Sequence, residues 1–248
     1  MNRYNDYDVI AWLYNREMGF FGSNIFPFLK IIAGDTLPDG ARILDLCCGT
    51  GQLARVLCEK GYKVTGIDGS ARMLQYARKN APAAKFILGD VRTFKLPTEY
   101  DAVFSTFDAL NHIMTLSELE QVFDNVSNCL HKGGIFIFDM NMQKHFETTM
   151  KGKNSIHESH KFLYIMRTEY DAETKLGKYR FTIFRPEKEL WKRTDQVYYQ
   201  TWYAMADLVS SLKKTGFSSI KTHGFTHQRE LKEADKNSDR VFFYAQKS

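Results

Sequence analysis

The chain has 248 residues, of which 44% are hydrophobic and 25% are charged, a composition typical of water-soluble globular proteins. No apolar run approaches the ~20 residues of a transmembrane helix, and the N-terminal segment lacks the apolar stretch of a signal peptide, so we expect a cytoplasmic protein without membrane contact. The net charge of +5 is too small to indicate a nucleic-acid partner.

Helical patterns over residues 7–14 and 24–34 come first in the chain. A regular alternation of short apolar strands and amphipathic helices follows them. The expected strands are 42–46, 63–68, 85–88, 100–105 and 135–139, and the expected helices are 52–60, 71–80 and 116–130. This alternation predicts the α/β class, with a doubly wound, mostly parallel Rossmann-like sheet that carries helices on both faces.

The pattern changes after residue 139. Segments rich in aromatic and β-branched residues, without a helical period, predict antiparallel strands at 161–170, 178–185 and 190–203. A helix at 205–215 and strands at 220–225 and 240–246 then return to the main sheet and close it with an antiparallel hairpin. We therefore expect one Rossmann-like domain formed by residues 1–145 and 204–248, interrupted by a small antiparallel β insert at 146–203.

A glycine turn, Gly49-Thr50-Gly51, lies between the first strand and the first core helix. Glycine lets the backbone approach a ligand closely, and a helix N-terminus offers unpaired N–H groups. Asp68, at the end of the second strand, can accept hydrogen bonds from two ribose hydroxyls. These features fit NAD and S-adenosyl-L-methionine (SAM) equally well, because both cofactors carry such a ribose.

Three further features favour SAM. Asp45 ends the first strand, where a carboxylate would repel a pyrophosphate but tolerates an ammonium group. Asp90 and Val91 follow the third strand, where a carboxylate and the next N–H can bind an adenine edge. The chain ends in an antiparallel hairpin rather than in a second mononucleotide-binding half.

Five segments together resemble, in order, the motifs of the class I SAM-dependent methyltransferases. They are residues 43–51, 64–74, 89–91, 100–112 and 130–136. One departure is Cys47, where the first motif often has glycine. Only the backbone at that position is needed to contact the cofactor, so Cys47 is compatible with a SAM site.

The resemblance implies SAM as cofactor and S-adenosyl-L-homocysteine as product. It also implies a role for each matching residue. The methionine part of SAM would be bound by Tyr14, Asp45, Cys47, Cys48, Gly49 and Gly51, and the ribose by Asp68. The adenine would be bound by Gly69, Met73, Asp90 and Val91. Thr106 and Phe107 would lie beside the sulfonium.

His112 and Asp108 are the candidate catalytic residues, because both follow the fourth motif close to the expected acceptor. An imidazole titrates near neutral pH and can remove a proton from the acceptor. Packing or capping of the next helix is the competing interpretation for both residues. Asn111 is a candidate for orienting the acceptor without proton transfer.

The β insert resembles, more loosely, that of small-molecule N-methyltransferases, including those that act on amino sugars. We therefore expect a small-molecule acceptor with a nitrogen or oxygen nucleophile, and an insert that either covers the acceptor or forms a homodimer contact. Three alternatives remain: an NAD-dependent oxidoreductase, a non-catalytic SAM-binding protein, and an RNA or protein methyltransferase. No metal site is expected from the four cysteines or from the histidine pairs 157/160 and 223/227.

Overall fold

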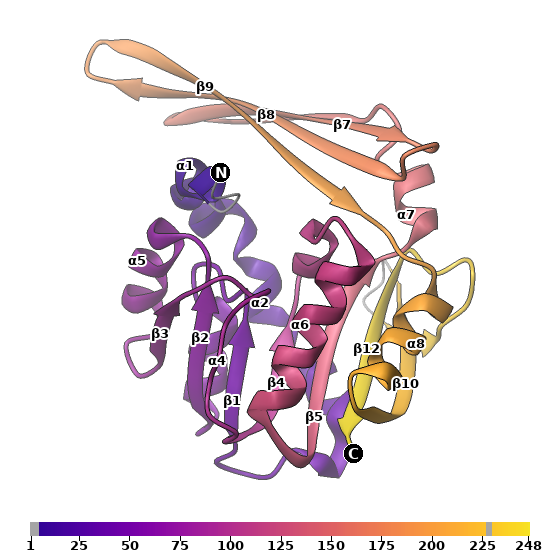
Figure 1. Cartoon of the computed structure of the whole chain (residues 1–248). Coiled ribbons are helices and arrows are strands. Elements are labelled where there is room, and N and C mark those ends of the chain that lie inside the picture. Colours follow the sequence, from indigo (N-terminus) through magenta and orange to yellow (C-terminus); the bar gives the residue numbers. More distant parts are fainter. Residues whose placement is uncertain (1–4, 227–229) are drawn as a thin grey trace.

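The computed structural model describes residues 5–226 and 230–248. It contains a large mixed sheet with helices on both faces and a separate four-stranded antiparallel sheet, which lies across one end of the large sheet (Figure 1). The predicted α/β class with an antiparallel β insert is confirmed.

The large sheet has the strand order β11-β10-β12-β5-β4-β1-β2-β3. All five predicted core strands are present in the parallel part of this sheet. They are β1 (Arg42–Leu46), β2 (Lys63–Asp68), β3 (Lys85–Leu88), β4 (Tyr100–Ser105) and β5 (Leu130–Asn141). β10 (Phe217–Phe225) and β12 (Arg240–Lys247) form the predicted antiparallel hairpin next to β5, and β11 (Leu231–Glu233) is an unpredicted edge strand.

Alternate residues of the core strands face two separate apolar clusters. Ile43 of β1 packs with α3 (Phe26–Ala33) and α4 (Gln52–Glu59). Its neighbour Leu44 packs with α6 (Leu116–Cys129) and α8 (Met205–Lys214). A sheet buried on both faces leaves its strand ends as the exposed part where a ligand can bind.

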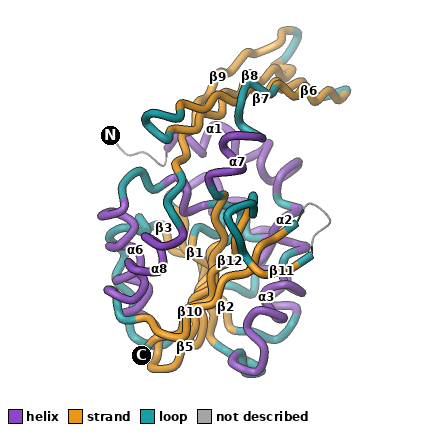
Figure 2. The backbone as a smooth tube through the Cα atoms, turned by 90° about the vertical axis from the view of Figure 1, so that its right-hand side faces the viewer, coloured by secondary structure: helices purple, strands orange, loops and turns teal. Residues whose placement is uncertain are grey.

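The N-terminal segment crosses the carboxyl ends of the core strands. It consists of α1 (Asn5–Leu13), a π-helical turn η1 (Tyr14–Met18) and α2 (Phe20–Asn24). α1 packs on α5 (Ala71–Asn80), and its buried Ile10 and Leu13 contact the small sheet. α1 therefore packs between α5 and the small sheet, and Figure 2 shows it next to the small sheet.

The small sheet contains β6 (Asn154–Ser159), β7 (Phe162–Asp171), β8 (Leu176–Glu187) and β9 (Leu190–Thr201), all antiparallel. The last three were predicted. β6 and the short helix α7 (Gln143–Thr148) were missed, because β6 is largely exposed and polar and α7 is too short for a helical period. Two short 3₁₀ turns, η2 (Gly34–Thr36) and η3 (Ala109–His112), complete the fold. In the described ranges, no helix has the length and hydrophobicity that crossing a membrane requires.

Candidate functional site

The turn after β1 adopts an unusual backbone. Cys47, Gly49 and Gly51 all have positive φ angles, of 61°, 53° and 81°. A Cβ added at Gly51 would lie 2.9 Å from the Cα of Ala77 in α5. The turn therefore needs glycine both for its left-handed conformation and for the close approach of α5.

Asp68 joins this turn to the next one. One carboxylate oxygen accepts a hydrogen bond from the N–H of Gly49 at 2.9 Å, and the other accepts from the N–H of Ser70 at 2.8 Å. Burial raises the pKa of Asp68 to about 6, although these two N–H groups oppose the shift. Each oxygen retains a further lone pair, so the carboxylate can accept two more hydrogen bonds.

Asp45 carries a buried oxygen that has no partner among the described residues. The side chain is 2% exposed, and its Oδ2 atom makes no hydrogen bond there. Burial and the nearby charge of Asp68 raise the pKa of Asp45 to about 8, while the N–H of Ala54 opposes the shift. An unpaired buried carboxylate oxygen is costly, and a cationic ligand group would remove that cost.

Six of the predicted residues meet around one small cavity beside Asp45. Its lining includes Tyr14, Asp45, Cys47, Cys48, Thr106 and Phe107. The cavity volume is about 20 Å³, room for about one water molecule. Phe21 of α2 stacks on Phe107, with 4.7 Å between the ring centroids. The cavity volume is far below the ~300–1,000 Å³ of sites for small molecules, so the side chains that line the cavity must move apart before a ligand the size of SAM can bind.

The residues predicted to hold adenine lie outside this cavity, along the ends of β2 and β3. Asp90 forms an ion pair with Arg92 at 2.7 Å, and Arg92 also pairs with Glu118. Val91 and Met73 are each 2% exposed and belong to the core. Met73 and the partly buried Gly69 flank Ser70, whose hydroxyl caps α5 by accepting from the N–H of Met73.

Asp108 belongs to a strained, charged cluster next to the cavity. Phe107 and Asp108 both have positive φ, and both donate their N–H groups to the carboxylate of Asp139. The Asp108 carboxylate contacts Arg240 Nη2 at 2.5 Å and accepts from Gln200 Nε2 at 2.6 Å. Arg240 also pairs with Asp139, so one guanidinium is shared by two buried carboxylates.

His112 has a defined tautomer. Its Nδ1 lies 2.7 Å from the carbonyl oxygen of Tyr199, which can only accept, so Nδ1 carries the proton. Its Nε2 lies 2.8 Å from the hydroxyl of Tyr7 and therefore accepts. Burial lowers the pKa of His112, although Asp108 opposes the shift. His112 is thus a neutral imidazole with its basic nitrogen turned toward α1.

Asn111 is committed to the protein rather than available to a ligand. Its amide donates to the carbonyls of Asn141 and Thr201 at 3.0 and 2.8 Å, and its oxygen accepts from the N–H of Asn141. The sequence-based assignment of Asn111 to an acceptor is therefore replaced by a structural role. Asn111 joins η3 to β5 and β9.

Sequence analysis missed four members of the polar cluster: Tyr7, Asp139, Gln200 and Arg240. Arg240 carried the clearest signal, because it directly precedes the apolar run 241–245, and a cation in such a position requires a buried partner. Asp139 carried a second signal at the end of β5. Among the described residues, no group of three or more potential metal ligands occurs, and His227 lies outside them.

Residues 43–134 match a protein family described as a methyltransferase domain. The chain is 29% identical over 217 residues to the putative methyltransferase YqeM of Bacillus subtilis, which covers 86% of this chain and 87% of the relative. It is 30% identical over 102 residues to the dTDP-3-amino-3,4,6-trideoxy-alpha-D-glucopyranose N,N-dimethyltransferase of Streptomyces venezuelae, covering 41% and 43% of the two chains.

A solved structure shares the fold over nearly the whole length. The crystal structure of a SAM-dependent methyltransferase from Clostridium acetobutylicum superposes with a TM-score of 0.80 at 22% identity and covers 98% of this chain and 99% of that one. The shared fold thus includes the small sheet as well as the core. These matches favour SAM over NAD, the alternative that the glycine turn alone left open.

Proposed function

We propose that this chain, a SAM-dependent methyltransferase of the class I fold, methylates an amine nitrogen of a small molecule. The observation that carries the proposal is the polar cluster in which Gln200 of the small sheet contacts both Asp108 and His112, next to Phe107 of the cavity. The name of the Streptomyces venezuelae relative, an amino-sugar dimethyltransferase, supports a nitrogen acceptor.

The residues of the β1 turn fit the amino-acid end of SAM. The unpartnered Oδ2 of Asp45 would receive the ammonium group, which would supply the missing partner. Asp68 would hold the ribose hydroxyls with its remaining lone pairs, and Thr106 and Phe107 would lie beside the sulfur. Bound SAM supplies an activated methyl group whose leaving group is neutral, so alignment and the exclusion of water are the main tasks of the protein.

His112 would accept the proton that a protonated amine must lose before its nitrogen lone pair can attack the methyl group. The neutral imidazole presents Nε2 as an acceptor, and the Tyr7 hydroxyl at 2.8 Å and the amide nitrogen of Gln200 at 3.2 Å lie against it. An acceptor amine would replace the hydroxyl or share the nitrogen with it. Asp108 would orient the acceptor, because Arg240 and Gln200 hold its carboxylate in place. The small sheet, through β9, would cover the acceptor.

The experiment is a transfer assay with methyl-labelled SAM and a panel of amines, amino sugars, phenols, carboxylates, RNA and protein. We expect label on small amines. General acid–base catalysis contributes about 10²–10⁴-fold, so His112→Gln should lower kcat at least about a hundredfold while SAM binding is kept. His131→Gln, an exposed histidine, is the control and should retain full activity.

Two outcomes would reject the proposal. Labelling of RNA or protein in preference to every amine would make this a macromolecule methyltransferase. SAM binding without transfer to any acceptor would favour the non-catalytic alternative. Equal loss of kcat in His112→Gln and His131→Gln would remove His112 from the mechanism.

A further inference from the structure

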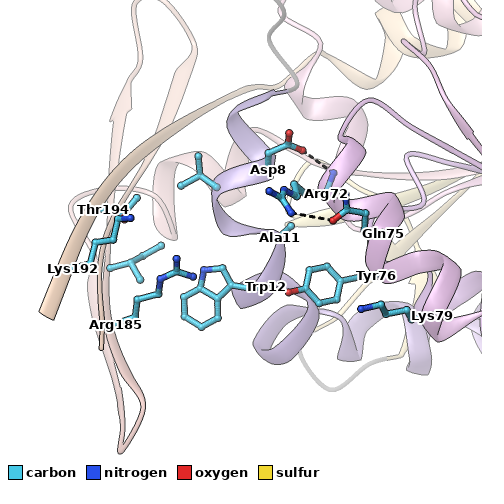
Figure 3. Close-up of a pocket in the computed structure, with 12 residues that line it drawn as sticks. Asp8, Ala11, Trp12, Arg72, Gln75, Tyr76, Lys79, Arg185, Lys192 and Thr194 are labelled. Atoms are coloured by element: carbon cyan, nitrogen blue, oxygen red, sulfur yellow. Dashed lines mark hydrogen bonds between the residues drawn. The ribbon is translucent and has the colours of Figure 1, made fainter. Parts of the chain in front are cut away.

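A large groove lies on the opposite side of α1 from the candidate site. It has a volume of about 660 Å³ and is bounded by α1, by α5 and by strands β8 and β9 (Figure 3). This volume lies within the ~300–1,000 Å³ of sites for small molecules. Tyr7 of α1 contacts His112, and Tyr14, directly after α1, lines the cavity beside Asp45, whereas Asp8 and Trp12 of α1 line the groove. The helix therefore separates the groove from the methyl-transfer site.

Four cations line the groove from two opposing walls. Arg72 and Lys79 come from α5, whereas Arg185 and Lys192 come from the small sheet. Lys192 pairs with Glu187 at 3.2 Å. Arg72, Lys79 and Arg185 have no ion pair within the described residues. Positive charges that converge on a concave surface focus the field and attract an anion.

The one carboxylate in the lining does not neutralise these cations. Asp8 accepts from the Ser70 hydroxyl at 2.5 Å and from the backbone N–H of Arg72 at 3.0 Å. It thus acts as a cap on α5 rather than as a counter-ion for the groove. The positive charges of Arg72, Lys79 and Arg185 remain available to a ligand.

Two aromatic rings complete the groove. Trp12 and Tyr76 are both partly buried, and Trp12 lies between Arg185 and Tyr76 (Figure 3). The guanidinium of Arg185 lies over the Trp12 ring, 5.7 Å from its centroid. Aromatic rings next to guanidinium groups form a surface on which a planar heterocycle can stack.

We propose that this groove binds a nucleotide, as a site separate from the SAM site. The base would stack between Trp12 and Tyr76, and its phosphates would contact Arg72, Lys79 and Lys192. The charged residues are confined to a groove of about 660 Å³, which accommodates a single nucleotide rather than a strand of RNA. This site does not depend on which acceptor is methylated.

The test is calorimetric titration of the full chain with ADP in the presence of saturating S-adenosyl-L-homocysteine, which occupies the SAM site. Inorganic pyrophosphate, adenosine and a short single-stranded RNA are titrated in parallel. We expect ADP to bind, and Arg72→Gln combined with Lys79→Gln to weaken it at least tenfold. Lys213→Gln, on the exposed side of α8, is the matched control and should bind ADP normally.

The phosphate-binding cations and the base-binding rings are tested separately. If pyrophosphate binds as tightly as ADP, Trp12 and Tyr76 do not contribute to binding, and the proposed nucleotide site is wrong. ADP that binds only without S-adenosyl-L-homocysteine would place it in the SAM site and overturn the proposal. RNA that binds more tightly than ADP, and is weakened by the same double variant, would replace the nucleotide with a strand. Retained ADP affinity in the double variant would also overturn the site.

Discussion

At the residue scale, Asp45 combines a cost to folding with a role in binding. Its pKa of about 8 in the folded protein lies far above the ordinary value of 3.8, so the folded state binds this proton more tightly than the unfolded chain does. The free energy of unfolding therefore falls as the pH rises from about 4 to about 8, and levels off above that range. The ammonium group of SAM would remove the penalty at the upper end.

Asp45→Asn should therefore stabilise the ligand-free protein and weaken SAM binding. The amide keeps an oxygen that can accept from the N–H of Ala54 but carries no charge to bury. We expect the Tm of the variant to exceed that of the wild type by more at pH 8 than at pH 5, measured by thermal unfolding. SAM affinity, measured by calorimetry, should fall at least about tenfold. Parallel pH dependence in the two proteins would contradict this account.

His112 gives a second expectation at this scale. Because burial lowers its pKa below the ordinary value of 6.5, the imidazole is already deprotonated at neutral pH. The acidic limb of the plot of kcat against pH should therefore lie below pH 6.5. Above pH 6.5, the titration of His112 should cause no further change in kcat. Tyr7→Phe removes the hydrogen bond to Nε2 and should move that limb. An unchanged limb in Tyr7→Phe would show that another group controls it.

At the element scale, the packing of α4 against α5 depends on Gly51. Alanine there would take a left-handed φ, which costs about 1–2 kcal/mol, and its Cβ would lie 2.9 Å from the Ala77 backbone. Gly61→Ala is a matched control, because Gly61 has a similar φ of 87° but nothing within 4 Å of the added Cβ. Any loss of stability in Gly51→Ala beyond the loss in Gly61→Ala therefore measures the clash with Ala77.

We expect Gly51→Ala to have a Tm several degrees below that of Gly61→Ala. Overpacking costs about 1–3 kcal/mol, and 1 kcal/mol shifts the Tm by about 2–4 °C in a chain of this size. Equal Tm values would mean that α5 moves aside without cost. SAM affinity should fall in Gly51→Ala and persist in Gly61→Ala, since only the former distorts the turn after β1.

Elements with strong local patterns were predictable, and elements without them were not. β1, β2, β3 and β4 begin and end at the residues that the alternation of strand and helix patterns indicated. β6 lacked a signal because most of its residues are exposed on both faces. The breaks at Gly19 and Ile25, which separate α2 from its neighbours, coincide with a glycine and with Pro27 in the first turn of α3, signals that were not used in predicting the helices.

At the scale of the whole molecule, the candidate site divides into a local part and a long-range part. The residues of the β1 and β2 turns lie within one βαβ unit, so their motifs indicated them. The polar cluster depends instead on contacts such as Arg240 with Asp108 and Tyr7 with His112, which lie 132 and 105 residues apart in the chain. Spacing along the sequence carries no information about such contacts before the fold is known.

Asn111 is one of the residues that join the two sheets. It satisfies the Asn141 N–H and the carbonyls of Asn141 and Thr201, all within the interior. Asn111→Ala would leave these groups unpaired, at about 1–3 kcal/mol each. We expect a Tm lower by several degrees and faster hydrogen exchange at the end of β9, measured by mass spectrometry.

The control for this variant is Asn128→Ala, which removes only an exposed hydrogen bond to Asp124 and should leave both measurements unchanged. The exchange readout separates local detachment from general loss of stability. If the join between the sheets fails first, exchange should increase in β9 before it increases in β1 at the centre of the large sheet. A uniform increase in both strands would mean that Asn111 stabilises the fold as a whole without acting as the specific connection between the sheets.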